Sequence, residues 1–367
     1  MKSAQRLLST LKNLIFITLP TLLILLIALE LFFRFGIRAS DPPNNYFDET
    51  QRLYCFDDVG ETGLFTIGKF ADIQTSWQIN NYRWNAPIDY HPSLKQPLIS
   101  IIGDSYIEAF QVDVDKNYPS LLRKLLADEY QVYSFGKSGN PFSQYLHLSR
   151  YVTQHFDPEV LVFNLVHNDF GESIQRLYPH KSYMMQLAID QQGQIKETTP
   201  KAPLAAPQYH FWKRWLRKSA IFRYFIFNLK LTGNTSVIPK KAKTKKFEAN
   251  VKVEKLKKRQ DLIQKATAYL VKTIRNENPD KQIIMVLDAP RHHIYQQTLQ
   301  ASEVNWIHHM MDSLCVQHQV DFIDLTPVMT QDYQKNRQKF NSDLDNHWNT
   351  YGHQLVAQTL YQHLIQP

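Results

Sequence analysis

The sequence predicts an α/β protein built on a parallel sheet, with one transmembrane helix near its N-terminus. Strand-like and helix-like segments alternate from about residue 97 onward, at the lengths typical of such a sheet. An apolar run long enough to cross a bilayer precedes them. With 367 residues, 43% of them hydrophobic, the chain has room for a membrane segment and one large, well-filled domain.

The first predicted element is the membrane helix. Seventeen uncharged, mostly apolar residues separate Lys12 from Glu30, and apolar residues resume up to Phe33. About 20 such residues span the hydrocarbon of a bilayer. We therefore expect residues 1–12 to be cytoplasmic and residues 13–33 to form an uncleaved anchor. A cleaved signal peptide is the alternative, but its apolar region is usually ~7–15 residues long, and no clear small-x-small cleavage site follows this run.

Charges on the two sides of the apolar run predict its orientation. Lys2, Arg6, Lys12 and the amino terminus lie before it, whereas only Arg34 and Arg38 follow closely behind. Because cytoplasmic flanks carry the excess of Lys and Arg, the N-terminus is expected in the cytoplasm and the body of the protein outside.

Residues 34–96 are expected to form a stalk and a small β-rich cap, because they contain short alternating runs such as Ser76–Asn80 and no long helical period. Residues 97–367 then form the predicted domain, with an insertion at about 170–254 where the alternation breaks. Strands are expected near residues 98–102, 131–135, 160–166, 282–287 and 321–325, and helices near residues 118–128, 142–153, 254–276, 304–316 and 351–365.

The positive charge of the protein is concentrated in one segment, which overlaps the second half of the insertion. Sixteen Lys and Arg face two Glu between Lys213 and Arg259, whereas the whole chain has a net charge of only +8. Aromatic and basic residues interleave over His210–Lys230, which is typical of an interfacial helix on an anionic membrane or of an amphipathic helix packed on the domain. The Lys240–Arg259 run is expected to be a solvated, mobile arm that docks acidic glycans or lipid head groups. Nucleic acid is not a predicted partner, since the topology places the body outside the cytoplasm.

Residues suited to nucleophilic catalysis follow the predicted strands. Gly103-Asp-Ser105 comes directly after the first strand, at the sheet edge where open parallel sheets bind ligands. A serine nucleophile needs a base and a group that orients the base, and the segment Asp345-Asn-His347 supplies both just before the last helix. An oxyanion also needs hydrogen-bond donors. Gly139, after the second strand, and Asn168, after the third, are suitable.

In this order, the blocks Gly103-Asp-Ser105, Gly139, Asn168-Asp169 and Asp345-x-His347 resemble those of the SGNH/GDSL hydrolase superfamily, over roughly residues 97–367. The resemblance implies a three-layer, flavodoxin-like fold and a serine enzyme that uses no metal and no cofactor. It also implies the roles of the site residues: nucleophile Ser105, base His347, orienting carboxylate Asp345, and an oxyanion hole formed by Ser105, Gly139 and Asn168.

One block departs from the common pattern of that superfamily, which places the Asp three residues before the His. Here that position is Leu344, so Asp345 is the first choice and Asp343 the reserve. The Asp-x-His-Trp form is similar to the variant in membrane-linked bacterial polysaccharide O-acetyltransferases and their relatives. Together with the anchor and orientation predicted above, this similarity implies a single-pass protein of the bacterial inner membrane with a periplasmic catalytic domain.

The expected function is therefore that of an esterase acting through an acyl-enzyme on O-acyl groups of cell-envelope carbohydrate, with a lipid ester as the other substrate class. Two alternatives stay open: an O-acetyltransferase served by a membrane acyl-donor protein, and a catalytically silent glycan-binding or scaffold protein. No residue in the sequence decides between hydrolysis and transfer, because the two differ only in whether water or a sugar hydroxyl resolves the acyl-enzyme.

The remaining cysteines and histidines predict no metal site. Cys55 and Cys315 are too few for a four-cysteine zinc site, and whether they pair stays open. The pairs His292-His293 and His308-His309 are adjacent in sequence, so their side chains do not face one another on a helix. We expect surface or packing histidines there, while His167 is either a substrate contact or a plain strand-end residue.

Overall fold

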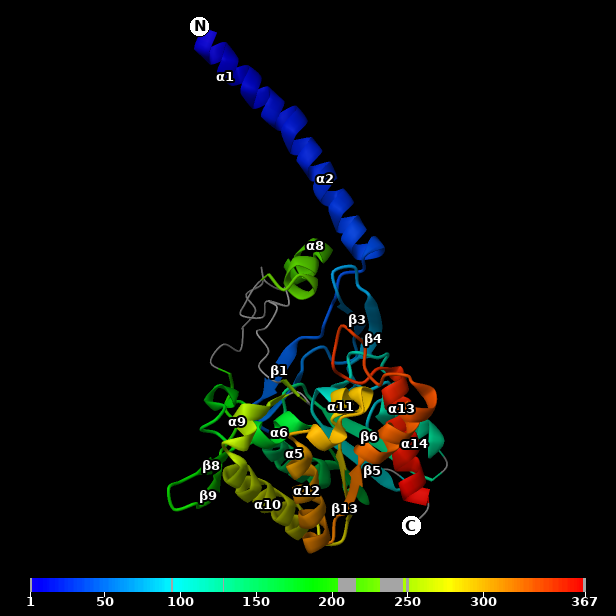
Figure 1. Cartoon of the computed structure of the whole chain (residues 1–367). Coiled ribbons are helices and arrows are strands. Elements are labelled where there is room, and N and C mark those ends of the chain that lie inside the picture. The colour runs from blue at the N-terminus through cyan, green and yellow to red at the C-terminus, as the bar shows by residue number, and fades with distance from the viewer. Residues whose placement is uncertain are drawn as a thin grey trace. The chain divides into compact units, whose positions relative to one another are not determined.

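An apolar helix and an α/β domain dominate the computed structural model (Figure 1), which describes residues 2–93, 95–127, 129–203, 216–231, 247–248 and 251–365. The chain divides into two units. The first comprises Met1–Pro42, Leu64–Gln74 and Pro207–Lys240. The second comprises Pro43–Gly63, Thr75–Ala206 and Lys241–Pro367.

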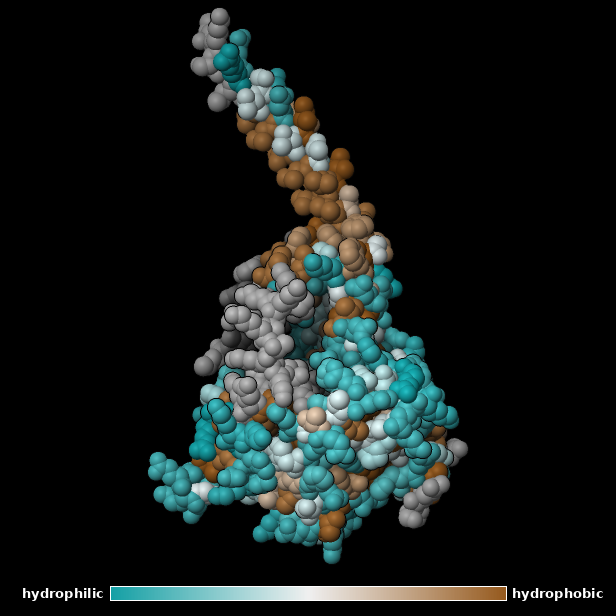
Figure 2. All heavy atoms as spheres, in the orientation of Figure 1, coloured by the Kyte–Doolittle hydropathy of each residue, from teal (hydrophilic) through white to brown (hydrophobic). Residues whose placement is uncertain are grey.

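The first unit begins with a continuous helix, made of α1 (Lys2–Asn13), a π-helical turn η1 (Leu14–Thr18), α2 (Leu19–Leu31) and a second π-helical turn η2 (Phe32–Gly36). Its stretch Leu8–Gly36 has 29 residues and a mean hydropathy of 2.6. At 1.5 Å per residue this stretch is about 40 Å long, which exceeds the ~30 Å of bilayer hydrocarbon. Figure 2 shows its exposed apolar surface in brown. The helix is thus long and apolar enough to cross a membrane.

The second unit is built on a five-stranded sheet in which every neighbouring pair of strands is parallel. Its order is β13-β12-β7-β5-β6. In chain order this is 2-1-3-4-5, the flavodoxin-like arrangement, so the predicted fold is confirmed. The order reverses between β5 and β7, and ligands bind at such a reversal. The strands are β5 (Leu98–Gly103), β6 (Gln131–Gly136), β7 (Val160–Leu165), β12 (Gln282–Leu287) and β13 (Asp321–Asp324).

Helices cover both faces of this sheet and complete three layers. One core contains Leu98 and Ile102 of β5 together with residues of α5, α10 and α12, and the other contains Ile99 and Ile101 together with residues of α4, α11, α13 and α14. Because successive strand side chains point to opposite faces, a nearly all-apolar strand serves both cores. In Figure 1, α10 and α12 lie on one side of the strands and α13 and α14 on the other. The covering helices are α4 (Tyr118–Leu125), α5 (Phe142–Phe156), α10 (Gln260–Glu277), α11 (Arg291–Gln296), α12 (Asn305–His318), α13 (Leu325–Asn336) and α14 (Thr350–Ile365).

Short elements complete the chain. Outside the main sheet, short strands of two to six residues form separate two-stranded sheets: β1 (Asn45–Asp48) with β2 (Leu53–Phe56), β3 (Thr62–Ile67) with β4 (Ile73–Gln78), β8 (Leu187–Ile189) with β9 (Ile195–Glu197), and β10 (Phe247–Glu248) with β11 (Val251–Lys252). The short helices are α3 (Ser105–Glu108), α6 (His167–Glu172), η3 (Pro179–Lys181), α8 (Ala220–Arg223), η4 (Tyr224–Asn228), α9 (Val253–Lys257) and η5 (Leu299–Ala301).

Several sequence-based expectations change at this level. The Lys240–Arg259 run is not a mobile arm throughout, because α9 forms within it and Leu256 is buried in the core. The reason is that Val251, Val253 and Leu256 offer apolar surface between the charged residues. Residues 240–246 and 249–250 of that run, and residues 210–215 of the aromatic and basic stretch, lie outside the described residues. Helix α13 was not expected from the sequence.

Two buried residues of the expected cap belong to the main core instead. Trp84 and Tyr90 are 1% exposed and lie in the same apolar cluster as strand residues of the sheet. Cys55 and Cys315 are both free and buried, so they do not pair.

A close approach between two strand ends and the following helix determines where α3 lies. Gly103 at the end of β5 is paired with Gly136 at the end of β6. A Cβ atom on Gly136 would lie 2.3 Å from the backbone nitrogen of Glu108, and one on Gly103 would lie 2.3 Å from a side-chain carbon of Ile107. Only hydrogen fits at these positions, so both glycines allow α3 to sit directly over the strand ends.

We expect Gly136→Ala to destabilise the protein by about 1–3 kcal/mol, because the backbone of Glu108 cannot move away from an added methyl group without displacing α3. Gly171→Ala is the matched control: it is also buried, but its Cβ would meet nothing closer than 3.8 Å. Thermal unfolding of the detergent-solubilised full chain, followed by circular dichroism, measures both. Equal stability of the two variants would contradict the close approach.

Candidate active site

Ser105 is presented by the turn between β5 and α3. Asp104 caps the helix, its carboxylate accepting a hydrogen bond of 2.9 Å from the Tyr106 N–H. Ser105 is the first residue of α3, and its Oγ lies 2.8 Å from Nε2 of His347 and 3.3 Å from a carboxylate oxygen of Asp104. A serine hydroxyl at this distance from an imidazole nitrogen is within reach for proton transfer.

The imidazole of His347 is held from its other side by Asp345. The carboxylate of Asp345 accepts hydrogen bonds from Nδ1 of His347 and, at 2.8 Å, from its backbone N–H. With the proton on Nδ1, Nε2 is free to accept the proton of Ser105. The reserve residue Asp343 is 85% exposed and pairs with Lys339 at 2.8 Å. The structure therefore brings Ser105, His347 and Asp345 together and leaves Asp343 outside this row.

Electrostatics around the imidazole favour its protonated form. Burial alone would lower the pKa of His347, but the hydrogen bond to Asp345 and the charges of Asp345 and Asp104 outweigh it, so the pKa is raised above its ordinary value. Burial also raises the pKa of Asp104 to about 6, against the opposing effects of the Tyr106 N–H and of His347. The surroundings of His347 thus favour the imidazolium form of its side chain.

A buried ion pair, Asp288–Arg291, binds the residues directly before and after His347 in the chain, and sequence reasoning missed it. Arg291 Nη2 donates to the backbone oxygen of Asn346 at 2.6 Å and lies 3.2 Å from the Asp288 carboxylate. The other oxygen of Asp288 accepts a hydrogen bond of 3.0 Å from Nε1 of the buried Trp348. The loop carrying His347 is therefore fastened immediately before and after the imidazole.

Tyr106 links this clamp to the serine turn. Its hydroxyl accepts a hydrogen bond of 2.6 Å from Arg291 and donates one of 3.2 Å to the backbone oxygen of Asn346. Asp288 directly follows the end of β12, as Asp104 directly follows the end of β5. Asp288 was not predicted, although its place directly after a buried strand is a pattern in the sequence that could have indicated it.

The two other predicted site residues follow the strands on either side of β5. Gly139 lies three residues after β6 and has a positive φ of 81°, and Lys181 donates to its carbonyl oxygen at 2.7 Å. Asn168 lies in the first turn of α6, just after β7, and is partly buried. Since the carboxyl ends of parallel strands meet at one edge, the sheet brings Gly139, Ser105 and Asn168 to the same edge.

Among the residues that the structure describes, two further histidines lie close together but form no metal site. His167 is buried, and its Nε2 lies 2.9 Å from Nε2 of His308, whose Nδ1 lies 2.9 Å from the Asp324 carboxylate. No group of three or more His, Cys, Asp or Glu among the described residues could hold a metal ion. His308 is thus a buried, hydrogen-bonded packing residue.

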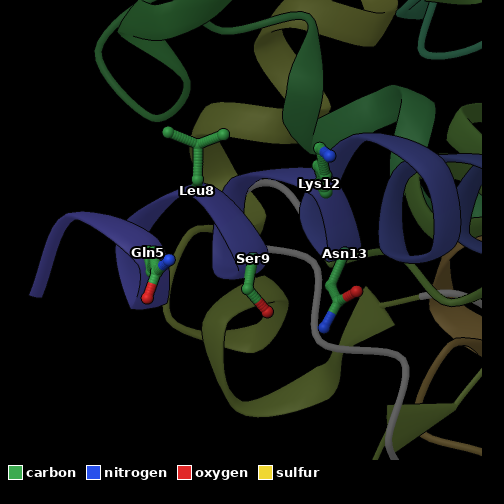
Figure 3. Close-up of a pocket in the computed structure, with 5 residues that line it drawn as sticks. All are labelled: Gln5, Leu8, Ser9, Lys12 and Asn13. Atoms are coloured by element: carbon green, nitrogen blue, oxygen red, sulfur yellow. The ribbon is translucent and has the colours of Figure 1, made fainter. Parts of the chain in front are cut away.

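A shallow hollow on the N-terminal helix offers no comparable chemistry. Figure 3 shows its lining, in which all the side chains come from α1: Gln5, Leu8, Ser9, Lys12 and Asn13. None of these pairs a nucleophile with a histidine base, as Ser105 and His347 do.

Comparisons with known proteins identify relatives of this chain. The model of the GDSL-like lipase/acylhydrolase family matches residues 101–355, which is more than half of the chain. Similar solved structures include an acetyl xylan esterase (14% identity, covering 73% of this chain and 99% of that chain, TM-score 0.40). They also include a lipolytic G-D-S-L family protein from Veillonella parvula (9%, 74% and 99%, TM-score 0.41) and the lipase/acylhydrolase from Enterococcus faecalis (11%, 73% and 95%, TM-score 0.39). No curated protein matches.

We expect the reactivity of Ser105 toward a fluorophosphonate to rise with pH as His347 loses its proton, with a midpoint above the usual ~6.5 of histidine. Asp345→Asn removes the negative charge that stabilises the imidazolium, so the midpoint moves to lower pH while the plateau rate falls by about 10⁴-fold. Asp343→Asn, the exposed control, leaves both unchanged. A shift in the control variant but not in Asp345→Asn would assign the orienting role to Asp343.

Trp348→Phe removes the indole N–H that donates a hydrogen bond to Asp288, and leaves that buried carboxylate oxygen without this donor. We expect a loss of about 1–3 kcal/mol in stability, together with slower labelling of Ser105, because the loop holding His347 loosens. Trp84→Phe is the matched control, since Trp84 is equally buried and its Nε1 has no hydrogen-bond partner among the described residues. Equal stability losses in urea unfolding would show that the clamp contributes nothing beyond aromatic volume.

Proposed function

This chain belongs to the GDSL-like lipase/acylhydrolase family, and from that membership we propose that it is a serine esterase that removes O-acyl groups from cell-envelope carbohydrate through an acyl-enzyme. The observation that carries the reaction type is the row Ser105–His347–Asp345, with 2.8 Å between the serine oxygen and the imidazole nitrogen. In this proposal Ser105 is the nucleophile, His347 the general base and Asp345 the carboxylate that orients it.

The proposed reaction has two halves. His347 takes the proton of Ser105 as its oxygen attacks the ester carbonyl, and the resulting imidazolium then protonates the departing alcohol, which leaves an acyl group on Ser105. In the second half His347 takes a proton from water, the hydroxide oxygen attacks the acyl carbon, and the released serine oxygen recovers the proton. Asp345 stays ionised throughout and stabilises the imidazolium.

The negative oxygen of each tetrahedral intermediate needs donors that are already in place. We assign this role to the N–H groups of Ser105 and Gly139 and to the side chain of Asn168. Within the described part of the chain, neither of these two N–H groups donates to another residue, which supports their availability. Among the described residues, the Asn168 amide has a single long contact, 3.4 Å to Asp169, so it too can turn toward a substrate.

The N-terminal helix supports the location that we propose. Residues 13–33 anchor the protein in the bacterial inner membrane as a single span, with the N-terminus in the cytoplasm and the α/β unit in the periplasm. The 29-residue apolar helix is long enough to cross the bilayer, and the cations Arg6 and Lys12 precede the proposed span of residues 13–33. An enzyme tethered there meets acylated polymers of the cell envelope.

The substrate class rests on the Asp345-x-His347-Trp348 block, which is similar to that of bacterial polysaccharide O-acetyltransferases. In the structure Trp348 is fully buried and bonded to Asp288, so it supports the histidine loop rather than touching substrate. We therefore take the block as a sign of relationship to these O-acetyltransferases, and propose an O-acylated carbohydrate as the substrate. A lipid ester is the competing class, and transfer to a sugar hydroxyl is the competing reaction.

We expect the full chain in detergent to release acetate from O-acetylated polysaccharide and to be labelled by a fluorophosphonate at Ser105. Ser105→Ala and His347→Ala should each lower kcat by about 10⁶-fold, because each removes a partner of the proton transfer. Mass spectrometry of the labelled peptide and of the sugar products measures these outcomes, with p-nitrophenyl acetate as a general ester control.

The same experiment separates the competing functions. If the protein releases fatty acid from phospholipid but no acetate, the substrate class is lipid rather than carbohydrate. If acetylated sugar acceptors appear among the products, the reaction is transfer from an acyl donor rather than hydrolysis. A folded wild type that is neither labelled nor active on any of these esters would favour a silent glycan-binding protein.

A further inference from the structure

The insertion returns to the N-terminal helix and docks on its end. Residues 216–231 of the insertion belong to the first unit together with that helix. They form α8 and η4, and Ala220 and Tyr224 share a small apolar core with Phe33 and Ala39. The rings of Phe33 and Tyr224 stack at 4.2 Å between centroids. We call residues 216–231 the docked segment.

A single carboxylate in the apolar helix holds the beginning of the docked segment. Glu30 accepts hydrogen bonds from the backbone N–H groups of Ala220 at 2.8 Å and Ile221 at 3.1 Å, and from the hydroxyl of Ser219 at 2.8 Å. These are the N–H groups that the first turn of a helix leaves without partners. Glu30 therefore caps α8 from a distance of about 190 positions in the chain.

The charge of Glu30 is also balanced within the same unit. Arg34, one turn further along the apolar helix, pairs with Glu30 at 2.6 Å and donates to the backbone oxygen of Lys218 at 2.7 Å. Charged side chains are costly in a membrane-spanning segment unless they are paired. Both charges at this end of the helix are thus used to bind the docked segment.

The other end of the docked segment is fastened as well. The side-chain oxygen of Asn228 accepts from the Ser40 N–H at 2.9 Å, and its amide donates to Thr66 at 2.9 Å and to the Gly68 carbonyl at 3.1 Å. Arg223 forms an ion pair with Asp41. Since both ends of the docked segment are held by hydrogen bonds and ion pairs, the segment is an integral part of the first unit.

The surface of this unit mixes exposed apolar side chains with exposed cations. Phe70 is 76% exposed, Leu231 65% and Phe225 41%. Lys69 is adjacent to Phe70 and Lys230 to Leu231, and both lysines are exposed. Large apolar side chains next to Lys or Arg are the pattern of proteins that sit in the interface of an anionic membrane. In Figure 2 the brown surface of the helix continues onto the segment at its foot.

We propose that the docked segment and the neighbouring Lys69-Phe70 turn form a second membrane contact, which lies in the headgroup region of an anionic bilayer beside the end of the anchor. Phe70, Phe225 and Leu231 enter the interface, and Lys69, Lys218 and Lys230 bind the phosphate groups of the lipids. Glu30 and Arg34 keep the segment against the helix at that depth. This inference rests on the proposed anchoring of residues 13–33.

The test uses the full chain in nanodiscs of phosphatidylcholine, with or without phosphatidylglycerol. Both native cysteines are buried, so a cysteine introduced at the surface takes an environment-sensitive fluorophore. We expect lipids with a quencher near the headgroup to quench the label at Phe225→Cys, and more strongly with phosphatidylglycerol present. Val316→Cys, an exposed apolar position of the α/β unit (75%), should not be quenched. Leu22→Cys reports on the anchor and should respond to a quencher deep in the acyl chains.

The outcomes separate this inference from the anchoring. Quenching at Leu22→Cys without quenching at Phe225→Cys would overturn the second contact and leave the anchor in place, whereas no quenching at either position would overturn the anchoring itself. Two further variants address the mechanism. Lys69→Glu/Lys218→Glu/Lys230→Glu should abolish the effect of phosphatidylglycerol, and Glu30→Gln should reduce quenching at Phe225→Cys by releasing α8. Unchanged quenching in both would contradict the assigned roles of these charges.

Discussion

The buried ion pair between Asp288 and Arg291 is the interaction on which the site depends. Ser105 and His347 lie 242 positions apart in the chain, and the loop that carries the histidine has no helix or strand of its own to hold it. Burying two charges is costly, and the cost is offset here because the pair also binds the backbone of Asn346 and the indole of Trp348. The buried pair thus holds the loop in place immediately before and after His347.

The position of Ser105 likewise follows from the sheet. Strand order reverses beside β5, so the ends of β6, β5 and β7 meet at one edge and deliver Gly139, Ser105 and Asn168 to it. Gly103 and Gly136 let α3 come down onto the strand ends, because any side chain there would collide with α3. The position of Ser105 is therefore set by the strand order and by the absence of side chains at Gly103 and Gly136.

A third theme is the use of charge in the first unit. Glu30 and Arg34 lie at the end of an apolar helix, where isolated charges would be unfavourable, and both are bonded to residues 218–221 of the insertion. This arrangement holds residues 218–221 of the insertion against the end of the apolar helix.

The sequence alone was sufficient to predict the apolar length of residues 13–33, the strands of the sheet, and the blocks around Ser105 and His347, because these features depend on the periodicity and turn chemistry of consecutive residues. It left Asp345 and Asp343 as alternatives and did not reveal Arg291. Only the tertiary structure shows Asp343 bound to Lys339, α9 buried within a basic run, and Glu30 capping α8. Each of these is a contact between distant parts of the chain, and which distant groups meet is decided by packing rather than by local pattern.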